Sequence, residues 1–546
     1  MKLTSLGLAA LTAMMAACTA GTPLAASAQL PASDAAGIEA HMAYLASDDL
    51  EGRETGTPGY DLAADYVAGE FGKLGLAPAG DAGSYFQEIT FKRAVRAAEG
   101  RAFRVTDAAG NVLPFTEGQN AVVYTALKAP EATIEAPAVF VGFAIVAPEL
   151  GRDDFAGLDL TGKVAVVLSG TPKGIQSEER AFYGSRKSKN ISDRGAVAVV
   201  SVETPTSKGV YPFQRLLAEG RLEGASMAWM QADGTPYSNA PDIAAFAAVS
   251  LEGAAPLFTG SPVSWEEVIA AAEAESGAVP GFDLPLTISI TQRSVHDEVK
   301  SANVMGMIEG TDPDLKDEVI IISAHLDHIG ISKTIEEDTI NNGALDNASG
   351  VATMLDAARM LKAGPPMKRT VVFIALTAEE KGLLGAQYFA MNPSLPGTIV
   401  ANVNLDMPIL TYDFTDIIVY GALRSNIAAT VETAAAGMGI TLSPDPAPEQ
   451  GIFTRSDHFR FVEAGIPSVY LKPGFANGGD AAFAEHQARN YHRPSDDMSN
   501  KLDFAAAARF AELNARIALA LANQDAPPLW KKDDFFARQF NGPMEP

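Results

Sequence analysis

Histidine and carboxylate side chains follow successive expected strands in the second half of the chain. His325 comes three residues after an expected strand at Val319–Ile322, and the pair Glu379–Glu380 follows the expected strand Val371–Leu376. Asp406 ends the next strand-like run. Ligand sites in open α/β sheets lie beyond the carboxyl ends of the strands. Three strands are therefore expected to deliver His, Glu and Asp side chains to one edge of a sheet.

Two further side chains are expected at the same edge. Asp346 lies in a polar loop, and His492 lies in a loop after the expected strand Ser468–Leu471. Imidazole nitrogens and carboxylate oxygens are the ligands of hydrolytic zinc sites. Two such ions, about 3.5–4 Å apart, can share one carboxylate and one water. The set therefore predicts a pair of zinc ions.

The adjacent glutamates Glu379 and Glu380 suit two different tasks at such a site. Zinc lowers the pKa of a water and polarises the scissile carbonyl. A nearby carboxylate that binds no metal must still take the proton from the water and pass it to the leaving amine. One glutamate could bind metal while its neighbour faces the water.

The elements that position these residues alternate between strand and helix from Ser301 onward. This order predicts an α/β fold with a mainly parallel mixed sheet and covering helices. The helices expected from apolar residues at helical spacing are Asp34–Ala46, Val351–Leu361, Leu383–Ala390 and Phe504–Ala522. The tail from Ala526 contains prolines and is expected to pack loosely.

The block from about Val139 to Ile288 has a different sequence pattern. Short apolar runs at Val139–Phe143, Lys163–Leu168 and Gly195–Val200 predict buried strands. No His or Cys occurs between residues 41 and 296. The block therefore has no visible catalytic apparatus.

Five short motifs resemble those of the co-catalytic di-zinc exopeptidases, the family that includes bacterial aminopeptidases and glutamate carboxypeptidase. They follow in the family's order over about 170 residues, at 324–327, 343–350, 377–383, 404–407 and 491–494. The resemblance implies two Zn²⁺ per chain, with Asp346 bridging them. One ion would take His325 and Asp406, and the other Glu380 and His492.

The same resemblance assigns two supporting roles. Glu379 would be the general base, and Asp327 would hold the imidazole of His325 from behind, fixing its tautomer. Some family members carry a second Asp after the bridging one, where this chain has Asn347. That position is not expected to bind metal, so the change is expected to be tolerated.

The resemblance also implies a domain organisation. The middle block resembles the β-rich protease-associated domain that is inserted into many members, on the stretches 139–144 and 154–163. The expected division is a signal peptide at 1–28, a discontinuous zinc peptidase domain at 29–130 and 291–525, an inserted domain at 131–290 and a tail at 526–546.

The N-terminus has the pattern of an export signal. Lys2 precedes an almost uncharged, apolar run that ends at Ala26-Ser27-Ala28, a small-x-small cleavage pattern. The segment ending at Cys18 also resembles a lipoprotein box, which would anchor the chain by a lipid. Export to the periplasm, the medium or the envelope is expected, and the intact mass of the mature protein distinguishes a start at Gln29 from a lipidated Cys18.

Composition and charge exclude several classes of partner. Of 546 residues, 47% are hydrophobic and 20% are charged, as in ordinary soluble proteins. Lys+Arg number 41 and Asp+Glu 67, a net charge of −26, which argues against nucleic acid or an anionic membrane as the main partner. The single cysteine excludes a disulfide framework. After the signal, no stretch has the 18 or so apolar residues of a membrane span.

Several other polar motifs favour structural roles. His41, His296 and His486 are expected to be ordinary surface or core residues, and His328 a supporting residue near the metals. The run Ser456-Asp457-His458 is expected to support the pocket, because adjacency in sequence is not triad geometry. The acidic run 336–338 is expected to be a solvated loop. Asp496–Asp497 either orient His492 or form a plain polar loop.

The leading functional hypothesis is an exported aminopeptidase that acts on peptides. A carboxypeptidase, dipeptidase or acyl-amino-acid hydrolase could use the same zinc chemistry, and Arg455 and Arg493 could then bind a substrate carboxylate. A non-catalytic, receptor-like binding protein is the third possibility, but it would be expected to have lost ligands. The oligomeric state is left open.

Overall fold

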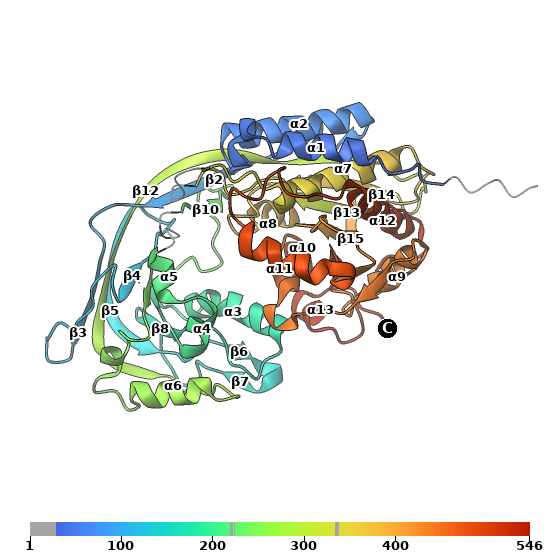
Figure 1. Cartoon of the computed structure of the whole chain (residues 1–546). Helices are drawn as coiled ribbons and strands as arrows, with labels where there is room; N and C mark the ends of the chain where they lie inside the picture. The colour runs from blue at the N-terminus through green and yellow to red at the C-terminus, as the bar shows by residue number, and fades with distance from the viewer. Residues whose placement is uncertain (1–28, 219–221, 223, 333–337) are drawn as a thin grey trace, which may run out of the picture.

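The computed structural model describes residues 29–218, 222, 224–332 and 338–546. The expected signal peptide, Cys18 and most of the acidic run 336–338 lie outside the described residues. Two parts of the molecule are joined by the long strand β12 (Phe282–Ile308), which curves between them (Figure 1). Within the described residues, one 16-stranded sheet passes through both parts.

Strand β12 is the element shared by the two parts. Its first half alternates buried and more exposed residues, as a strand with one covered face does, and Ser301–Met307 reads as continuously buried apart from its last residue. It pairs antiparallel with β5 (Glu131–Phe140) in one part and with β14 (Thr370–Leu376) in the other. At about 3.3 Å per residue, its 27 residues span on the order of 90 Å.

The part that carries the candidate ligands is built on parallel strands. β13 (Glu318–His325) pairs parallel with β14 and with β15 (Thr398–Leu405), and β15 pairs parallel with β18 (Ser468–Pro473). β16 (Asp416–Tyr420) runs antiparallel to β18 and carries β17 (Thr441–Ser443) at the edge. The predicted mixed, mainly parallel sheet is what the chain forms.

Helices cover both faces of these strands. Ile320 and Ile322 of β13 pack into the core under α1 (Ala35–Leu45), α2 (Pro58–Leu74), α7 (Ser349–Lys362) and α12 (Phe504–Asn523). The alternate residue Ile321 packs on the other face, with α8 (Leu384–Met391) and α10 (His458–Glu463). Burial on both faces explains why these strands are continuous apolar runs.

The second part holds the strands of the middle block. β5, β8 (Val164–Leu168), β9 (Ala198–Val202) and β11 (Ala245–Val249) form a parallel series, with β4 (Ala121–Val123) antiparallel at its end. The helices α3 (Ser177–Ser192) and α6 (Trp265–Glu273) contribute to its core. The domain boundaries predicted from the sequence remain predictions.

Short elements complete the chain. The remaining strands are β1 (Ala77–Pro78), β2 (Phe86–Arg96), β3 (Ala102–Asp107), β6 (Val146–Ala147), β7 (Arg152–Asp153) and β10 (Ser226–Trp229). The remaining helices are α4 (Pro205–Val210), α5 (Phe213–Ala218), α9 (Ile427–Ala436), α11 (Gly479–Arg489) and α13 (Phe535–Phe540).

The expected elements agree with the observed ones except near their ends. β13 continues to His325, so this histidine is the last residue of the strand and not three residues beyond it. The expected strand at 139–143 ends at Phe140, because Gly142 and Ala144 take positive φ values of 55° and 58°. The spacing of apolar side chains predicts where a strand lies better than it predicts the turn that ends the strand.

The expectation of a loosely packed tail is wrong. The indole of Trp530 is fully buried and donates a hydrogen bond to the Gly465 carbonyl at 2.8 Å. In α13, Phe536 is also fully buried. Four prolines follow Ala526, but the aromatic residues among them bury apolar area against the body of the protein.

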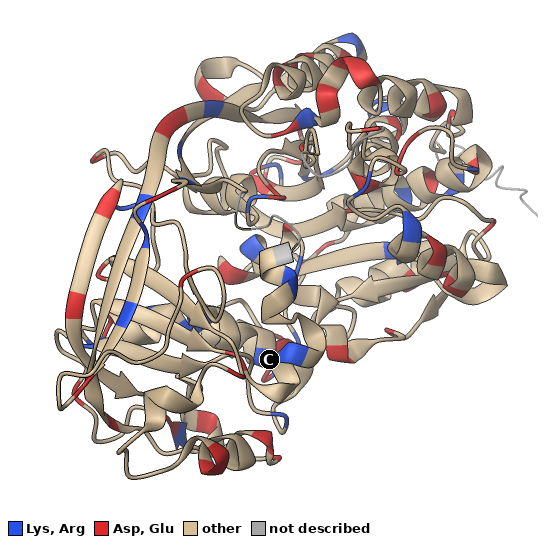
Figure 2. Cartoon of the chain, turned by 60° about the vertical axis from the view of Figure 1, so that its left-hand side comes forward, with Lys and Arg blue, Asp and Glu red and all other residues tan. Residues whose placement is uncertain are grey.

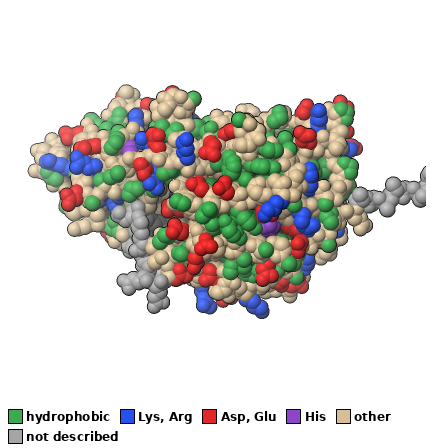
Figure 3. Space-filling view, turned by 90° about the horizontal axis from the view of Figure 1, so that it is seen from above, with side chains coloured by type: hydrophobic (Ala, Val, Ile, Leu, Met, Phe, Trp, Pro, Cys, Tyr) green, Lys and Arg blue, Asp and Glu red, His purple; other side chains and the backbone are tan. Residues whose placement is uncertain are grey.

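The surface carries mixed charges. Acidic and basic residues are interspersed over both parts of the chain (Figure 2), and from above, hydrophobic side chains lie among both kinds of charge (Figure 3). Among the described residues, no helix has the length and apolar character needed to cross a membrane.

Candidate metal centre

The sheet brings the predicted ligands to one edge. His325 ends β13, Asp406 directly follows β15, and Glu379 and Glu380 lie just beyond the end of β14. The parallel register aligns His325 with Leu376, the last residue of β14. Asp346 lies in the tight turn that precedes α7, and His492 follows α11. All five predicted ligands therefore meet.

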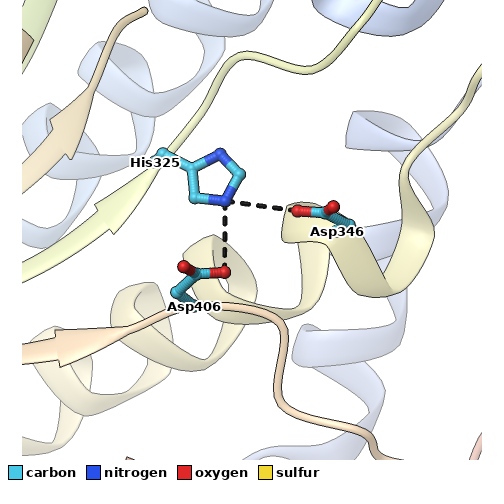
Figure 4. Close-up of side chains that lie close together, drawn as sticks. All are labelled: His325, Asp346 and Asp406. Atoms are coloured by element: carbon cyan, nitrogen blue, oxygen red, sulfur yellow. Dashed lines mark hydrogen bonds and ion pairs between the residues drawn. The ribbon is translucent and has the colours of Figure 1, made fainter. Parts of the chain in front are cut away.

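The geometry repeats on the two sides of Asp346. Nε2 of His325 lies 3.3 Å from Asp346 Oδ1 and 3.3 Å from Asp406 Oδ1, and the three side chains point toward one another (Figure 4). Nε2 of His492 lies 3.3 Å from Asp346 Oδ2 and 3.3 Å from Glu380 Oε2. One carboxylate thus faces two separate histidine–carboxylate pairs through its two oxygens.

His328 adjoins the second pair. Its Nδ1 lies 2.8 Å from Glu380 Oε1, and its Nε2 is buried without a hydrogen-bond partner among the described residues. By distance, His328, Asp346 and Glu380 could also hold an ion together. We favour His492 as the ligand, because its Nε2 faces both carboxylates, whereas His328 bonds to one oxygen of Glu380.

The neighbouring carboxylates shift the pKa values of the two histidines that flank Asp346. Burial opposes protonation of His325, but Glu379, Asp346 and Asp406 raise its pKa well above the usual range. Burial also opposes protonation of His492, yet Glu380 and Asp346 raise its pKa to about 10. The neighbouring carboxylates thus favour the positively charged form of the two imidazoles that flank Asp346.

The two neighbouring glutamates are shifted in opposite directions. Burial and the charge of Asp346 would raise the pKa of Glu380, but His492 and His328 lower it to about 2. Burial raises the pKa of Glu379 well above its usual range, and the charge of Glu380 adds to that rise. Environments that separate two carboxylates in this way are typical of sites where one carboxylate moves protons.

Asp327 contacts the imidazole of His325, as the sequence predicted, but through its main chain. Nδ1 of His325 lies 3.1 Å from the main-chain carbonyl oxygen of Asp327, not from its carboxylate. The carboxylate instead accepts hydrogen bonds from the backbone N–H groups of Glu379 at 3.0 Å and Glu380 at 3.3 Å. Asp327 lies two positions after His325, beyond the end of β13, and its carboxylate faces the segment that follows the neighbouring strand β14. Asp327 therefore fixes the two glutamates.

Two other polar residues fix the turn at Asp346. Asp496 accepts hydrogen bonds from the N–H groups of Leu345 and Asp346, so it orients the shared carboxylate and not His492. Asn347 donates to the Leu405 carbonyl at 3.0 Å, and its side-chain oxygen accepts from the N–H groups of Gly350 and Met407 at 3.0 Å. An aspartate in place of Asn347 could not make the donated bond. The peptide bond between Asp346 and Asn347 is cis.

Arg53 is a buried cation behind the site that the sequence did not reveal. Only 1% exposed, it donates to the carbonyls of Leu326, Asn342 and Gly343. Burial lowers its pKa to about 10, and the charge of Asp346 opposes that fall. Its place in the polar stretch 48–53 was the only available signal.

Ser456, Asp457 and His458 form no catalytic triad. The Ser456 hydroxyl donates to Asp406 Oδ2 at 2.5 Å and accepts from Asn404, so it supports a predicted ligand. The carboxylate of Asp457 and the ring nitrogens of His458 have no hydrogen-bond partner among the described residues. Elsewhere, His41 bonds to a tyrosine hydroxyl and His296 to a backbone carbonyl.

A pocket of about 120 Å³ opens beside these residues. We call it the catalytic pocket; Glu379 lines it, as do Arg455 and Lys472. Arg493, the other arginine singled out by sequence, is exposed and donates to the Ala488 carbonyl away from this pocket. Sequence reasoning missed Lys472, which lies inside a strand pattern and is 8% exposed.

Comparison with known proteins agrees with the site. Residues 303–518, which contain every predicted ligand, match the sequence model of peptidase family M28. Aminopeptidase YwaD of Bacillus subtilis is 33% identical over 190 residues, which are 34% of this chain and 37% of that protein. A probable zinc metalloprotease of Pyricularia oryzae is 28% identical over 268 residues, 42% of this chain and 51% of that protein. The matches thus span about a third to a half of these relatives.

A solved structure shares the fold. An aminopeptidase from Aneurinibacillus sp. strain AM-1 superposes with a TM-score of 0.51 at 20% identity, covering 91% of this chain and 95% of that one. The likeness extends over both parts of the molecule, so the chain has the overall architecture of that aminopeptidase.

The buried position of Arg53 predicts a large effect on stability. Arg53→Met should lower the free energy of unfolding by about 3–5 kcal/mol, because several carbonyls and the charge of Asp346 lose their buried cation. The midpoint of urea unfolding measures it. Arg516, an exposed arginine paired with Glu512 on α12, provides the control, and Arg516→Met should cost less than about 1 kcal/mol. Equal effects of the two changes would refute this role for Arg53.

Proposed function

Because residues 303–518 belong to peptidase family M28, we propose that the chain is a zinc-dependent exopeptidase, most simply an aminopeptidase that acts on peptides. The observation that carries the proposal is the shared carboxylate of Asp346 between two histidine–carboxylate pairs. Two ions of a co-catalytic site can share such a carboxylate.

The donor set fits zinc. His325, Asp346 and Asp406 would hold one ion, and Asp346, Glu380 and His492 the other. Imidazole nitrogen and carboxylate oxygen are common zinc donors, and the raised pKa values of both histidines mark places that attract positive charge. When bound, the ions would polarise the scissile carbonyl and lower the pKa of a water.

Glu379 is the residue available for proton transfer. It lines the catalytic pocket, and its carboxylate makes no hydrogen bond or ion pair with any residue that the structure describes. Its backbone is held by Asp327, so the side chain starts from a fixed position. Glu379 would take a proton from the attacking water at its carboxylate and deliver it to the leaving amine.

A second candidate function rests on two cations. Arg455 and Lys472 line the same catalytic pocket, and neither side chain has a hydrogen bond or ion pair with the described residues. Cations at this place could bind a free carboxylate of a dipeptide or of an acyl-amino acid. The chain would then be a carboxypeptidase, dipeptidase or acylase. A purely receptor-like role is disfavoured, because all the predicted ligands and Glu379 are present.

The two glutamates should fail in different ways when replaced. Glu379→Gln should retain bound zinc and substrate affinity but lower kcat by roughly 10²–10⁴, the scale of a positioned general base. Glu380→Ala should lower zinc content and activity together. Steady-state kinetics and metal analysis of both variants give the comparison. A zinc-loaded Glu379→Gln protein with nearly unchanged kcat would remove Glu379 from the mechanism.

The free amine of the substrate separates the two candidate functions. An aminopeptidase should cleave a free dipeptide far faster than its N-acetylated form, since losing a buried charge partner costs on the order of 2–5 kcal/mol. A carboxypeptidase or dipeptidase should instead lose activity when the C-terminal carboxylate is amidated. Rates on free, acetylated and amidated versions of one dipeptide decide between them, and equal rates on the free and acetylated forms would contradict the aminopeptidase proposal.

A further inference from the structure

A large cavity lies at the carboxyl ends of the second parallel series of strands. Its volume is about 820 Å³, and its floor is formed by Leu168, Ser201 and Val249, which lie at or next to the last residues of β8, β9 and β11. Helix α3 lines one wall. We call this space the sheet cavity. In open α/β sheets the carboxyl ends of the strands are the usual place for a ligand, yet the middle block has no His or Cys that could do chemistry there.

The sheet cavity adjoins the catalytic pocket. Gln450 lines both spaces. Its neighbour Gly451 faces the sheet cavity, whereas Ile452 and Arg455 face the catalytic pocket. A single short segment, 449–455, is therefore the wall between the two, and a chain that passes this segment would reach from one space into the other.

The two spaces are held in a fixed relation by contacts of α3. Arg424, from the part that carries the candidate ligands, pairs with Glu178 at the start of α3 and with Asp534 at 2.9 Å. The ring of Phe182 meets Phe535 of α13 edge-on at 5.2 Å, and α3 and α13 lie side by side where the two parts meet (Figure 1). Aromatic and ionic contacts of this kind make a stable junction.

The sizes of the spaces indicate what they can hold. Pockets for small ligands typically measure about 300–1,000 Å³. The catalytic pocket, at about 120 Å³, falls below that range, and the sheet cavity, at about 820 Å³, falls within it. The catalytic pocket thus suits the end of a chain, while the larger space suits several residues of an extended one.

The walls of the sheet cavity fit a peptide and its terminal carboxylate. Apolar side chains such as Val210, Leu216 and Phe246 line it beside polar strand ends. Arg180 of α3 also lines it, and its guanidinium has no hydrogen bond or ion pair with any described residue.

The other charged groups of the cavity are less available. Lys187 donates to the Leu168 carbonyl at 2.8 Å, and burial lowers its pKa to about 7. The carboxylate of Glu203 accepts from the N–H groups of Phe213 at 2.6 Å and Leu251 at 2.9 Å. Glu449, on the rim, is the remaining acid in the lining. Arg180 is therefore the permanently charged group that remains for a ligand.

We propose that the sheet cavity receives the C-terminal part of a peptide whose N-terminal residue occupies the catalytic pocket, with Arg180 facing its terminal carboxylate. This inference rests on the proposed aminopeptidase function. It names the substrate class as oligopeptides of several residues with apolar side chains beyond the first, in preference to dipeptides. An extended octapeptide spans up to about 28 Å, enough to occupy more than one such space.

Filling the cavity is the test. Gly184 and Ser188 line it on α3, and a Cβ at Gly184 would meet Thr171 at an ordinary 3.5 Å, so Gly184→Trp and Ser188→Trp both place bulk in the cavity. Ser185, on the same helix but exposed and outside the lining, gives the matched control Ser185→Trp. The measured quantity is the ratio of kcat/KM for an apolar octapeptide to that for a dipeptide with the same N-terminal residue.

The octapeptide should be preferred by the unmodified chain and by Ser185→Trp. Either filling variant should lower the ratio by about tenfold, the effect of losing roughly 1.4 kcal/mol of binding. A ratio of about one in the unmodified chain, or a ratio that both filling variants leave unchanged, overturns the inference. Ser188→Trp decides the matter if Gly184→Trp does not fold.

The carboxylate is tested separately with Arg180→Met. This change should raise KM for the octapeptide acid by about threefold, the scale of a partly exposed ion pair, and leave KM for the octapeptide amide unchanged. An equal effect on the acid and the amide refutes carboxylate binding at Arg180.

Calorimetry of octapeptide binding needs no turnover, so it separates this inference from the proposed function. Octapeptide binding that the filling variants weaken, in a chain that cleaves no peptide, would retain the cavity and reject the peptidase. Cleavage of dipeptide and octapeptide without any effect of the filling variants would retain the peptidase function and reject the role of the cavity.

Discussion

The concentration of carboxylates at one sheet edge determines how the surrounding residues are arranged. Seven acidic side chains lie there, all of them buried or half-buried: Asp327, Asp346, Glu379, Glu380, Asp406, Asp457 and Asp496. Uncompensated charges cannot be buried at such density. The surrounding protein offers Arg53, Lys472 and three imidazoles, and it satisfies further oxygens with backbone N–H groups. The shared position of Asp346 between two histidines indicates where additional positive charge belongs.

The fold meets this constraint by placing rigid elements under each ligand. Parallel strands with two covered faces set His325 and Asp406 at neighbouring ends, so their separation follows from the register of the sheet. Hydrogen bonds then orient the groups that come from loops. Asp327 holds the backbone of the two glutamates, and Asp496 holds that of Asp346. Preorganisation of this kind is what a catalytic site requires. The second part of the sheet, joined through β12, places a larger cavity beside the same site.

Sequence reasoning predicted the parallel sheet and the residues that meet at its edge, because apolar runs and the residues that end them are local patterns. It did not reach contacts set by tertiary geometry. The carboxylate of Asp327 turned out to serve Glu379 and not His325, since the direction of a side chain at a strand end depends on the neighbouring strand. Arg53 is distant in sequence from the carbonyls it binds. Trp530 docks a tail whose prolines indicated a loose segment.

We propose that two zinc ions share Asp346. Crystals of the zinc-loaded protein, measured at the zinc absorption edge, give a direct test, because the anomalous difference map locates each ion without reference to activity. We expect two peaks on either side of Asp346, about 3.5–4 Å apart, one beside His325 and Asp406 and the other beside Glu380 and His492. A single peak, or peaks away from Asp346, would contradict it.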